Sequence, residues 1–157
     1  KSNLVFAGDC NNSVGSELKK LVIELDLQKK VFFLGHVIDE IKSEVLANSK
    51  AMLLCSHDEN FGISVVESLG YGKPVLTTYK VNTYQKILNY NAGYVANTNV
   101  KSFSKIINKF ENLNLKEIKT MSKNARNCFN ENFNFLNKKE FIPNFEKINI
   151  FKNNEIK

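Results

Sequence analysis

Two glutamates, Glu59 and Glu67, carry carboxylates that could bind a ligand or take part in a reaction. They stand eight positions apart in the stretch ENFGISVVESLGYGKPV (59–75), on either side of a Phe-Gly pair. One carboxylate can accept hydrogen bonds from two neighbouring hydroxyls, which is what a ribose diol or a sugar offers. With twelve glutamates in the chain, such a pair is also expected by chance on a solvated helix. Spacing alone therefore leaves a ligand site and a hydrated surface both open.

The elements that must position these glutamates alternate between strands and helices. Short apolar runs at 4–7, 31–34, 51–55 and 74–77 are typical of strands buried on both faces of a parallel sheet, and 92–95 predicts a short last strand. Apolar residues at helical spacing mark the stretches 16–25, 39–48 and 62–71, and a helical turn is expected over 84–88. This order predicts an α/β fold, a Rossmann-like parallel sheet with flanking helices.

The remainder of the chain is predicted to be mainly helical. Helices are expected over 102–110 and 116–130, with a third that begins near Phe135 and is kinked at Pro143. The sequence shows no internal repeat, linker or low-complexity tract. We therefore predict a single domain over 1–157, with an α/β core in 1–95 and a helical tail in 96–157.

The chain between Ser56 and Glu67 is expected to line the ligand crevice. Ligands of open α/β sheets bind beyond the carboxyl ends of the strands, where the run 51–55 ends. A helix that begins at Gly62 would direct the free N–H groups of Ile63 and Ser64 into this crevice, where they suit a phosphate. Glu59 and Glu67 would then bracket a ligand with hydroxyls at both ends and phosphates between them, as in a nucleotide sugar.

The same stretch resembles the retaining glycosyltransferases of group 1 (family 4), whose fold is the two-domain GT-B arrangement. The elements of the family signature are present in register, as Glu59, Phe61-Gly62, Glu67, Ser68, Gly72 and Pro74-Val75. LVFAGD (4–9) is similar to the family's second donor-domain strand, and VFFLGHV (31–37) to its segment near the nucleotide base. The resemblance covers roughly residues 3–140, and it covers only the C-terminal, donor-binding half of such an enzyme.

The resemblance implies roles for individual residues. Glu59 would contact the hydroxyls of the donor sugar, and Glu67 would hold the ribose. The donor would also meet the amides of Gly62, Ile63 and Ser64. Phe61 is either a packing residue or a ligand contact, and His36 is either a surface or packing histidine or part of the base site. The other expected binding positions are Gly8, Gly35, His36 and Val37.

The activity implied is transfer of a sugar, with retention, from a nucleoside-diphosphate donor to an acceptor hydroxyl of a glycan or glycolipid. A UDP-sugar is the first donor to expect, and polysaccharide or glycoconjugate assembly, such as capsule or lipopolysaccharide, the first setting. No cofactor or metal is implied, because helix N-termini and basic groups can stabilise the leaving diphosphate. The sequence offers no Asp-x-Asp and no His/Cys cluster.

Two departures from the family pattern bear on completeness. The family's first strand, with its Gly-Arg and the Lys-Gly that follows, has no counterpart ahead of Lys1, and KVNTYQKI (80–87) replaces the usual Gly-Gly-x-x-Glu. We therefore expect an N-terminal GT-B domain or a partner subunit to supply the missing wall, and the chain alone to be inactive. A noncatalytic nucleotide-sugar-binding subunit and a generic flavodoxin-like domain are the rival interpretations. A Ser56–His57–Asp58 triad is rejected, because adjacent residues of one loop cannot adopt its geometry.

Charge and cysteine usage add broader expectations. The net charge of +6 lies wholly after Val95, where twelve basic residues face six acidic ones. A solvated helical face or attraction to an anionic membrane explains this excess; nucleic acid is disfavoured, because the lysines lack interleaved aromatics. The three cysteines are read as reduced packing residues. The sequence has no long apolar run and no signal-peptide pattern, so the expected location is the cytoplasm. Peripheral contact with the inner face of the membrane is a second expectation.

Overall fold

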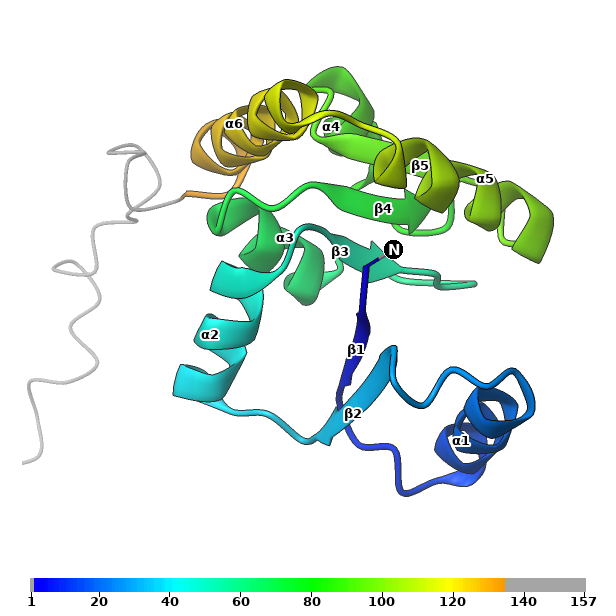
Figure 1. Cartoon of the computed structure of the whole chain (residues 1–157). Helices are drawn as coiled ribbons and strands as arrows, with labels where there is room; N and C mark the ends of the chain where they lie inside the picture. The colour runs from blue at the N-terminus through cyan, green and yellow to red at the C-terminus, as the bar shows by residue number, and fades with distance from the viewer. Residues whose placement is uncertain (1, 135–157) are drawn as a thin grey trace, which may run out of the picture.

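The computed structural model describes residues 2–134, in which strands and helices alternate along the chain (Figure 1). The Rossmann-like α/β class predicted from the sequence is confirmed, as are the helices in the tail as far as Asn132. The helix expected near Phe135 and its kink at Pro143 lie outside the described residues. In chain order the elements are β1 (Leu4–Ala7), α1 (Ser13–Glu24), β2 (Val31–Gly35), α2 (Asp39–Asn48), β3 (Met52–Leu54), α3 (Ile63–Gly70), β4 (Val75–Thr78), α4 (Tyr84–Asn89), β5 (Gly93–Ala96), α5 (Val100–Glu111) and α6 (Leu115–Asn132).

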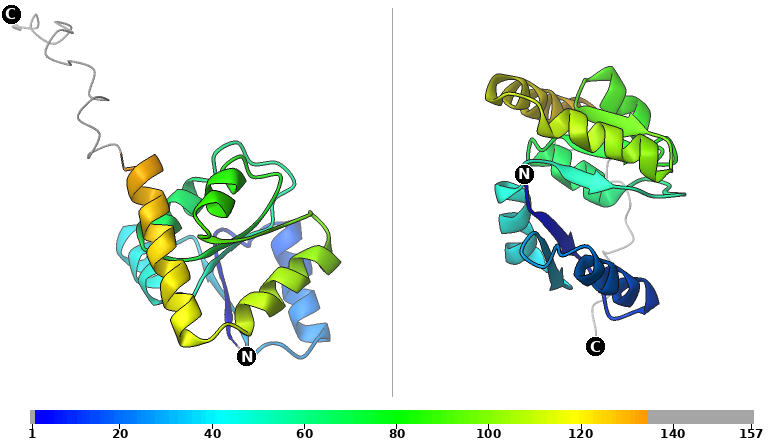
Figure 2. Two further views of the ribbon diagram at one scale, coloured as in Figure 1. Left: turned by 90° about the horizontal axis from the view of Figure 1, so that it is seen from above. Right: turned by 45° about the vertical axis from the view of Figure 1, so that its right-hand side comes forward.

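The strands form two parallel sheets in place of one continuous sheet. β1 pairs with β2 in one sheet, and β3, β4 and β5 follow one another in the second. In register, Leu4 lies opposite Val31, and Val75 lies between Met52 and Gly93. Within residues 2–134, no strand pairs with the second edge of β1 or of β3. Figure 2 shows the two sheets as separate layers with their own helices.

Asparagine side chains start three of the helices. Asn12 caps α1 and Asn99 caps α5, each accepting a hydrogen bond from a main-chain N–H in the first turn. Asn114 and Glu117 form a reciprocal capping box at the start of α6. Such caps satisfy donors that a helix N-terminus would otherwise leave unpaired. The many asparagines of this chain thus include residues that define where helices begin.

The core is built around the second sheet. Val75 faces α3, α4 and α6, where it packs with Leu69, Ile87 and Cys128. Leu76, one residue further on, points to the opposite face and packs with residues of α5 such as Phe103. β4 is buried along its whole length, as its apolar sequence predicts. The second sheet is therefore a rigid base for the loop and helix that carry the two glutamates.

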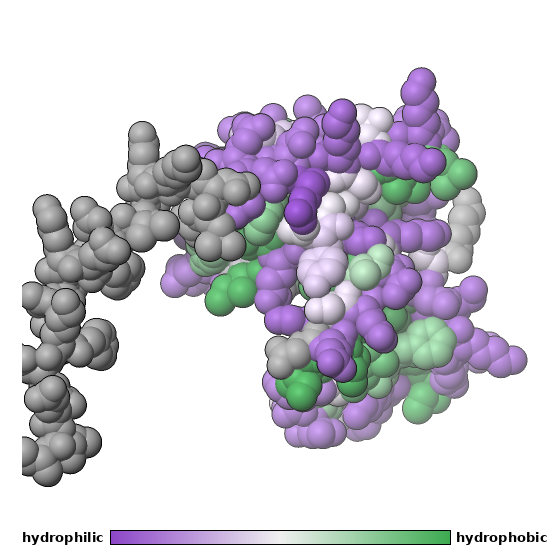
Figure 3. Space-filling view, turned by 90° about the vertical axis from the view of Figure 1, so that its left-hand side faces the viewer, coloured by the Kyte–Doolittle hydropathy of each residue, from purple (hydrophilic) through white to green (hydrophobic). Residues whose placement is uncertain are grey.

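The first sheet does not meet the prediction of strands buried on both faces. Phe6 and Phe33 stack on each other at 5.1 Å, but the side chains of Leu4, Val5 and Phe32 are exposed. Only Gly15 of α1 is buried, so this helix covers the sheet in part. In Figure 3 hydrophobic side chains gather on the surface at the height of β1 and β2, below the more hydrophilic region at the height of α6. The prediction is wrong here because the described residues provide little to cover these strands.

The cysteines are free thiols in three different environments. Cys128 is buried in the core, Cys10 is half-buried and Cys55 is exposed. The prediction of a packing role is therefore wrong for Cys55, which follows β3 directly and points away from the core. Among residues 2–134, no helix combines the length and apolar character that a membrane span requires.

Candidate functional site

The loop between β3 and α3 is held in place by hydrogen bonds to its own residues and to β4. The hydroxyl of Ser56 donates to the carbonyl of Asp58 at 2.9 Å, and the hydroxyl of Thr78 donates to the carbonyl of Ser56 at 2.6 Å. Gly62 ends the loop in the left-handed region, with φ of 69°, a conformation that glycine adopts without strain. The loop therefore presents the N-terminus of α3 in a fixed direction.

The carboxylate of Glu59 is part of this loop's framework. Its Oε1 accepts the N–H of Gly62 at 3.1 Å and that of Phe61 at 3.4 Å. Its main chain pairs with the segment after β4: the Glu59 N–H donates to the Lys80 carbonyl, and the Asn82 N–H donates to the Glu59 carbonyl. The stretch 80–87, which departs from the family pattern, thus supports Glu59. The Gly62 amide, expected to be open to a ligand, is occupied by this side chain.

Two amides at the start of α3 have no internal partner. Among residues 2–134, no acceptor lies within hydrogen-bond reach of the Ile63 or Ser64 N–H. Both residues have exposed side chains. Free N–H groups and the positive end of the helix dipole favour an anion at this point. The sequence predicted these two amides as donors, and the geometry leaves them open for that role.

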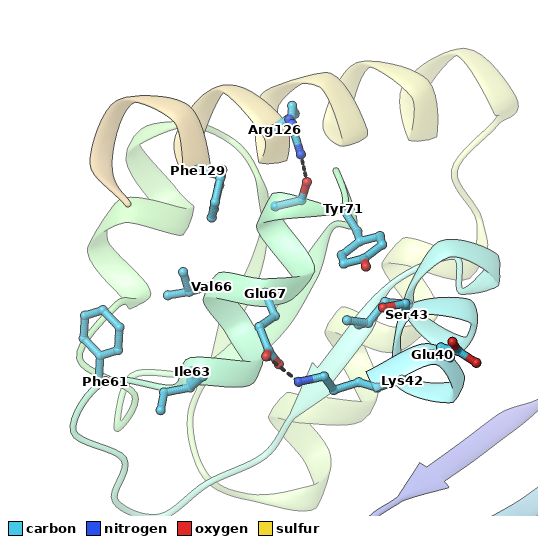
Figure 4. A pocket seen from close by; sticks show the side chains of 12 residues that line it. Glu40, Lys42, Ser43, Phe61, Ile63, Val66, Glu67, Tyr71, Arg126 and Phe129 are labelled. Atoms are coloured by element: carbon cyan, nitrogen blue, oxygen red, sulfur yellow. Dashed lines mark hydrogen bonds and ion pairs between the residues drawn. The ribbon is translucent and has the colours of Figure 1, made fainter. Parts of the chain in front are cut away.

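Glu67 lies one turn further along α3 and forms an ion pair with α2. The ammonium of Lys42 lies 2.6 Å from Oε1 of Glu67, and the two side chains are 42% and 35% exposed. Figure 4 shows the two groups pointing toward each other among the residues that line a pocket. Among the described residues, no group donates to the second oxygen, Oε2. The carboxylate is therefore oriented by Lys42 and can still accept a hydrogen bond.

A pocket of about 700 Å³ surrounds this ion pair, between α2, α3 and α6 (Figure 4). Of the residues predicted from the sequence, the pocket brings together Phe61, Ile63 and Glu67. Glu59, Gly62 and Ser64 belong to the same loop and helix start but do not line the pocket. Apolar and aromatic side chains form most of its wall, with Arg126 at one side, where its guanidinium donates to the carbonyl of Gly70.

The remaining predicted positions lie at the end of the first sheet. The Gly8 N–H donates to the Gly35 carbonyl at 2.8 Å, so the carboxyl ends of β1 and β2 lie side by side. His36 is exposed and Val37 is half-buried. These four residues form a second group, attached to a different sheet from the one that carries the glutamates.

Sequence reasoning missed the residues that reach the site from other elements. Lys42 stands 25 positions before Glu67, and Arg126 and Phe129 come more than 50 positions after the signature begins, so no local spacing connects these three residues to it. The alternation of strands and helices predicts that α2 and α3 are neighbours, but it does not predict which side chains meet. Among the described residues, no group of three or more His, Cys, Asp or Glu side chains could hold a metal ion.

Comparison of the sequence with known protein families identifies the family of this chain. The family model for glycosyl transferases group 1 matches residues 1–128. This chain belongs to the group 1 glycosyltransferases. Among its relatives is the alpha-1,3/1,6-mannosyltransferase ALG2 of Dictyostelium discoideum, 30% identical over 151 residues, which are 92% of this chain and 35% of the relative. The chain thus spans about a third of the length of this glycosyltransferase relative.

Solved structures of glycosyltransferases share the fold. The Anabaena HepE structure in complex with UDP matches 86% of this chain and 38% of its own, with a TM-score of 0.76 and 21% identity. The C-terminal domain of a Francisella tularensis group 1 glycosyltransferase, LpcC, matches 76% of this chain and 62% of its own, with a TM-score of 0.64 and 21% identity. The family and the fold predicted from the sequence are therefore confirmed.

Proposed function

We propose that this chain is the donor-binding domain of a retaining glycosyltransferase that transfers a sugar from a nucleoside-diphosphate sugar to an acceptor hydroxyl. The observation that carries this proposal is the pair of unpartnered amides, Ile63 and Ser64, between the carboxylates of Glu59 and Glu67. The amides suit the diphosphate, and the carboxylates suit hydroxyls on either side of it.

Each group has a distinct part in the proposed reaction. Glu67 holds the ribose through Oε2, which no described residue occupies, and Glu59 meets the sugar through its own Oε2 while Oε1 braces the loop. Negative charge develops on the leaving diphosphate, and the N-terminus of α3 stabilises it without reorganisation. Gly8, Gly35, His36 and Val37 contribute to the base side of the donor.

The activities named for similar proteins narrow the donors to be tested. The relative from Dictyostelium is a mannosyltransferase, and so are WbdA of Escherichia coli, 30% identical over 92 residues, and RfbU of Salmonella typhimurium, 31% identical over 97 residues. HepE was solved with UDP. We infer a hexosyl donor, with a UDP-sugar and a mannosyl donor as the first candidates, and a role in polysaccharide or glycolipid assembly.

The chain supplies one wall of the proposed reaction site. An acceptor must be held against the donor with water excluded, and proximity supplies much of the rate. We propose that an N-terminal domain or a partner subunit provides the acceptor side, and that residues 1–157 alone bind the donor without turnover. A noncatalytic nucleotide-sugar-binding subunit is the alternative.

The basic surface of α6 supports a peripheral location. Lys116, Lys119 and Lys123 recur at helical spacing and line one shallow pocket with Thr120. We propose that this face lies against anionic lipid at the cytoplasmic side of a membrane, where lipid-linked acceptors are reached.

Calorimetry with UDP, GDP and ADP, each with and without an attached hexose, tests the proposed function. One nucleoside diphosphate should bind in a one-to-one complex, and Glu59→Gln should weaken binding of the sugar-linked form more than that of the free diphosphate. Gln keeps an oxygen for the Gly62 and Phe61 amides, so the loop should be preserved. Absence of binding to all three nucleotides contradicts the proposal. Transfer assays with an added N-terminal domain then separate an enzyme from a noncatalytic subunit.

A further inference from the structure

The ion pair between Lys42 and Glu67 joins α2 to α3, and only α3 lies within the family signature. Lys42 lies on α2, outside the stretch 59–75, and reaches Oε1 of Glu67 at 2.6 Å (Figure 4). We propose that Lys42 is a positioning residue: it fixes the Glu67 carboxylate in the orientation that accepts the ribose hydroxyls of the donor. This inference rests on the proposed function, because Lys42 would orient a carboxylate of the same donor site.

Glu67 needs such a partner because its side chain is long and one-third exposed. A glutamate in this environment samples several rotamers. A ligand that fixes one rotamer on binding has a lower affinity, because the side chain loses conformational entropy. The ammonium of Lys42 holds Oε1 before any ligand arrives, and Oε2 has no donor among the described residues. One oxygen is thus engaged by protein, and the other is left for a ligand of the pocket that Glu67 lines.

Charge gives Lys42 a second effect at the same place. A lone carboxylate near a diphosphate would repel it, and a cation at 2.6 Å offsets much of that repulsion. Lys42 therefore makes a carboxylate compatible with an anionic ligand bound at the Ile63 and Ser64 amides. Arginine can keep both effects, because it is also cationic and donates hydrogen bonds; methionine keeps only the apolar stem.

The chain offers a matched control on the same pair of helices. The ammonium of Lys73, just after α3, donates to the carbonyl of Ala47 near the end of α2 at 2.7 Å. Lys73 thus ties α2 to the end of α3 as Lys42 does, but without touching Glu67. Lys73→Met measures the effect of a weaker contact between α2 and α3 alone. Lys42→Met measures that effect together with the loss of the bond to the Glu67 carboxylate.

The test is the preference for a ribose over a 2′-deoxyribose. Calorimetry with UDP and 2′-deoxy-UDP, and with the corresponding guanosine pair, is performed on the wild type, Lys42→Met, Lys42→Arg, Lys73→Met and Glu67→Gln. The wild type should prefer the ribose form of its nucleotide by about tenfold, as expected for a hydrogen bond to a charged group. Lys42→Met should reduce that preference to about threefold or less, while Lys42→Arg and Lys73→Met should retain it.

A double variant shows whether Lys42 acts through Glu67. With both Lys42→Met and Glu67→Gln, the ribose preference should fall no further than in Glu67→Gln alone, because the two residues form one unit. Thermal unfolding of each variant confirms that it is folded. The inference is overturned if Lys42→Met keeps the wild-type preference while Glu67→Gln loses it, or if the two losses add. If the wild type binds neither nucleotide pair, or Glu67→Gln changes nothing, the proposed function itself fails.

Discussion

Residues 2–50 and residues 51–134 differ sharply in how they bury their apolar side chains. Every buried hydrophobic residue of the described chain lies between Val65 and Phe133, around the second sheet. The first region has strands and a helix of similar apolar character, yet Leu4, Phe32 and Leu21 are exposed. The two regions are alike in sequence pattern and unlike in packing.

This difference shows how the candidate site is supported. Glu59 and Glu67 are carried by the well-packed region, on a loop bonded to β4 and a helix that buries Val65 and Leu69. Gly8 and Gly35 belong to the weakly packed region. Lys42, on α2, joins the two regions at the site itself. We expect the phosphate and ribose contacts to be preformed and the base contacts to depend on order in the first region.

Thiol alkylation should show the largest contrast between the regions. Burial raises the pKa of the Cys128 thiol to about 11, and the side chain has no exposed surface. Only the thiolate reacts, so at pH 8 Cys128 should be alkylated at least about a hundredfold more slowly than Cys10 of the first region. Mass spectrometry of iodoacetamide-treated protein measures both rates, and the exposed Cys55 provides the reference. Equal rates for Cys10 and Cys128 would break the comparison.

Truncating one leucine in each region measures the same contrast as free energy. Leu69 in α3 has no exposed surface, whereas Leu21 in α1 is 47% exposed. Leu69→Ala should lower the free energy of unfolding by about 2–5 kcal/mol, and Leu21→Ala by less than about 1 kcal/mol. Urea unfolding followed by circular dichroism gives both values. A larger cost for Leu21→Ala would mean that α1 is better packed than its exposure indicates.

Substitutions at the site compare the two regions in ligand binding. Glu67→Gln exchanges one acceptor oxygen for a donor and should weaken binding of the preferred nucleoside diphosphate by about 1–3 kcal/mol. His36→Ala, at the end of the first sheet, should cost less, because contacts from a weakly packed region are offset by the entropy of ordering that region on binding. Calorimetry of the two variants decides the order. A greater loss from His36→Ala would assign the main anchoring contacts to the first region.

The basic face of α6 is expected to give only a small effect for each substituted residue. Replacing Lys116, Lys119 and Lys123 with glutamine should weaken binding to vesicles containing phosphatidylserine by about 1 kcal/mol for each lysine. Co-sedimentation at two salt concentrations measures this. Binding that does not respond to salt, or that the triple variant leaves unchanged, would remove the membrane from the proposal.

The sequence predicted what local chemistry determines. Apolar runs located the strands, because a strand needs side chains that pack on a pleated surface. Gly62 located the start of α3, because the residue before this helix has a left-handed conformation that suits glycine. The register of the signature identified the family. These features depend on residues that are close in the sequence.

Features that depend on distant contacts could not be predicted in the same way. Leu4 and Val5 are exposed because, among residues 2–134, no strand pairs with the second edge of β1, which their own sequence does not encode. The ion pair of Lys42 with Glu67 depends on how α2 settles against α3, and the Glu59 bond to the Gly62 amide depends on one side-chain rotamer. The sequence named Glu59 and Glu67 as candidates, but it did not predict how their hydrogen-bonding capacity is divided.

A nitrogen-15 NMR titration of the chain with UDP and GDP follows each amide at the start of α3 separately. The Ile63 and Ser64 amides have no acceptor among residues 2–134, whereas the Gly62 amide is held by Glu59. Addition of the nucleotide that binds should therefore shift the Ile63 and Ser64 signals most, with a smaller change at Gly62. Largest shifts at the lysine face of α6, with Ile63 and Ser64 unchanged, would contradict the account.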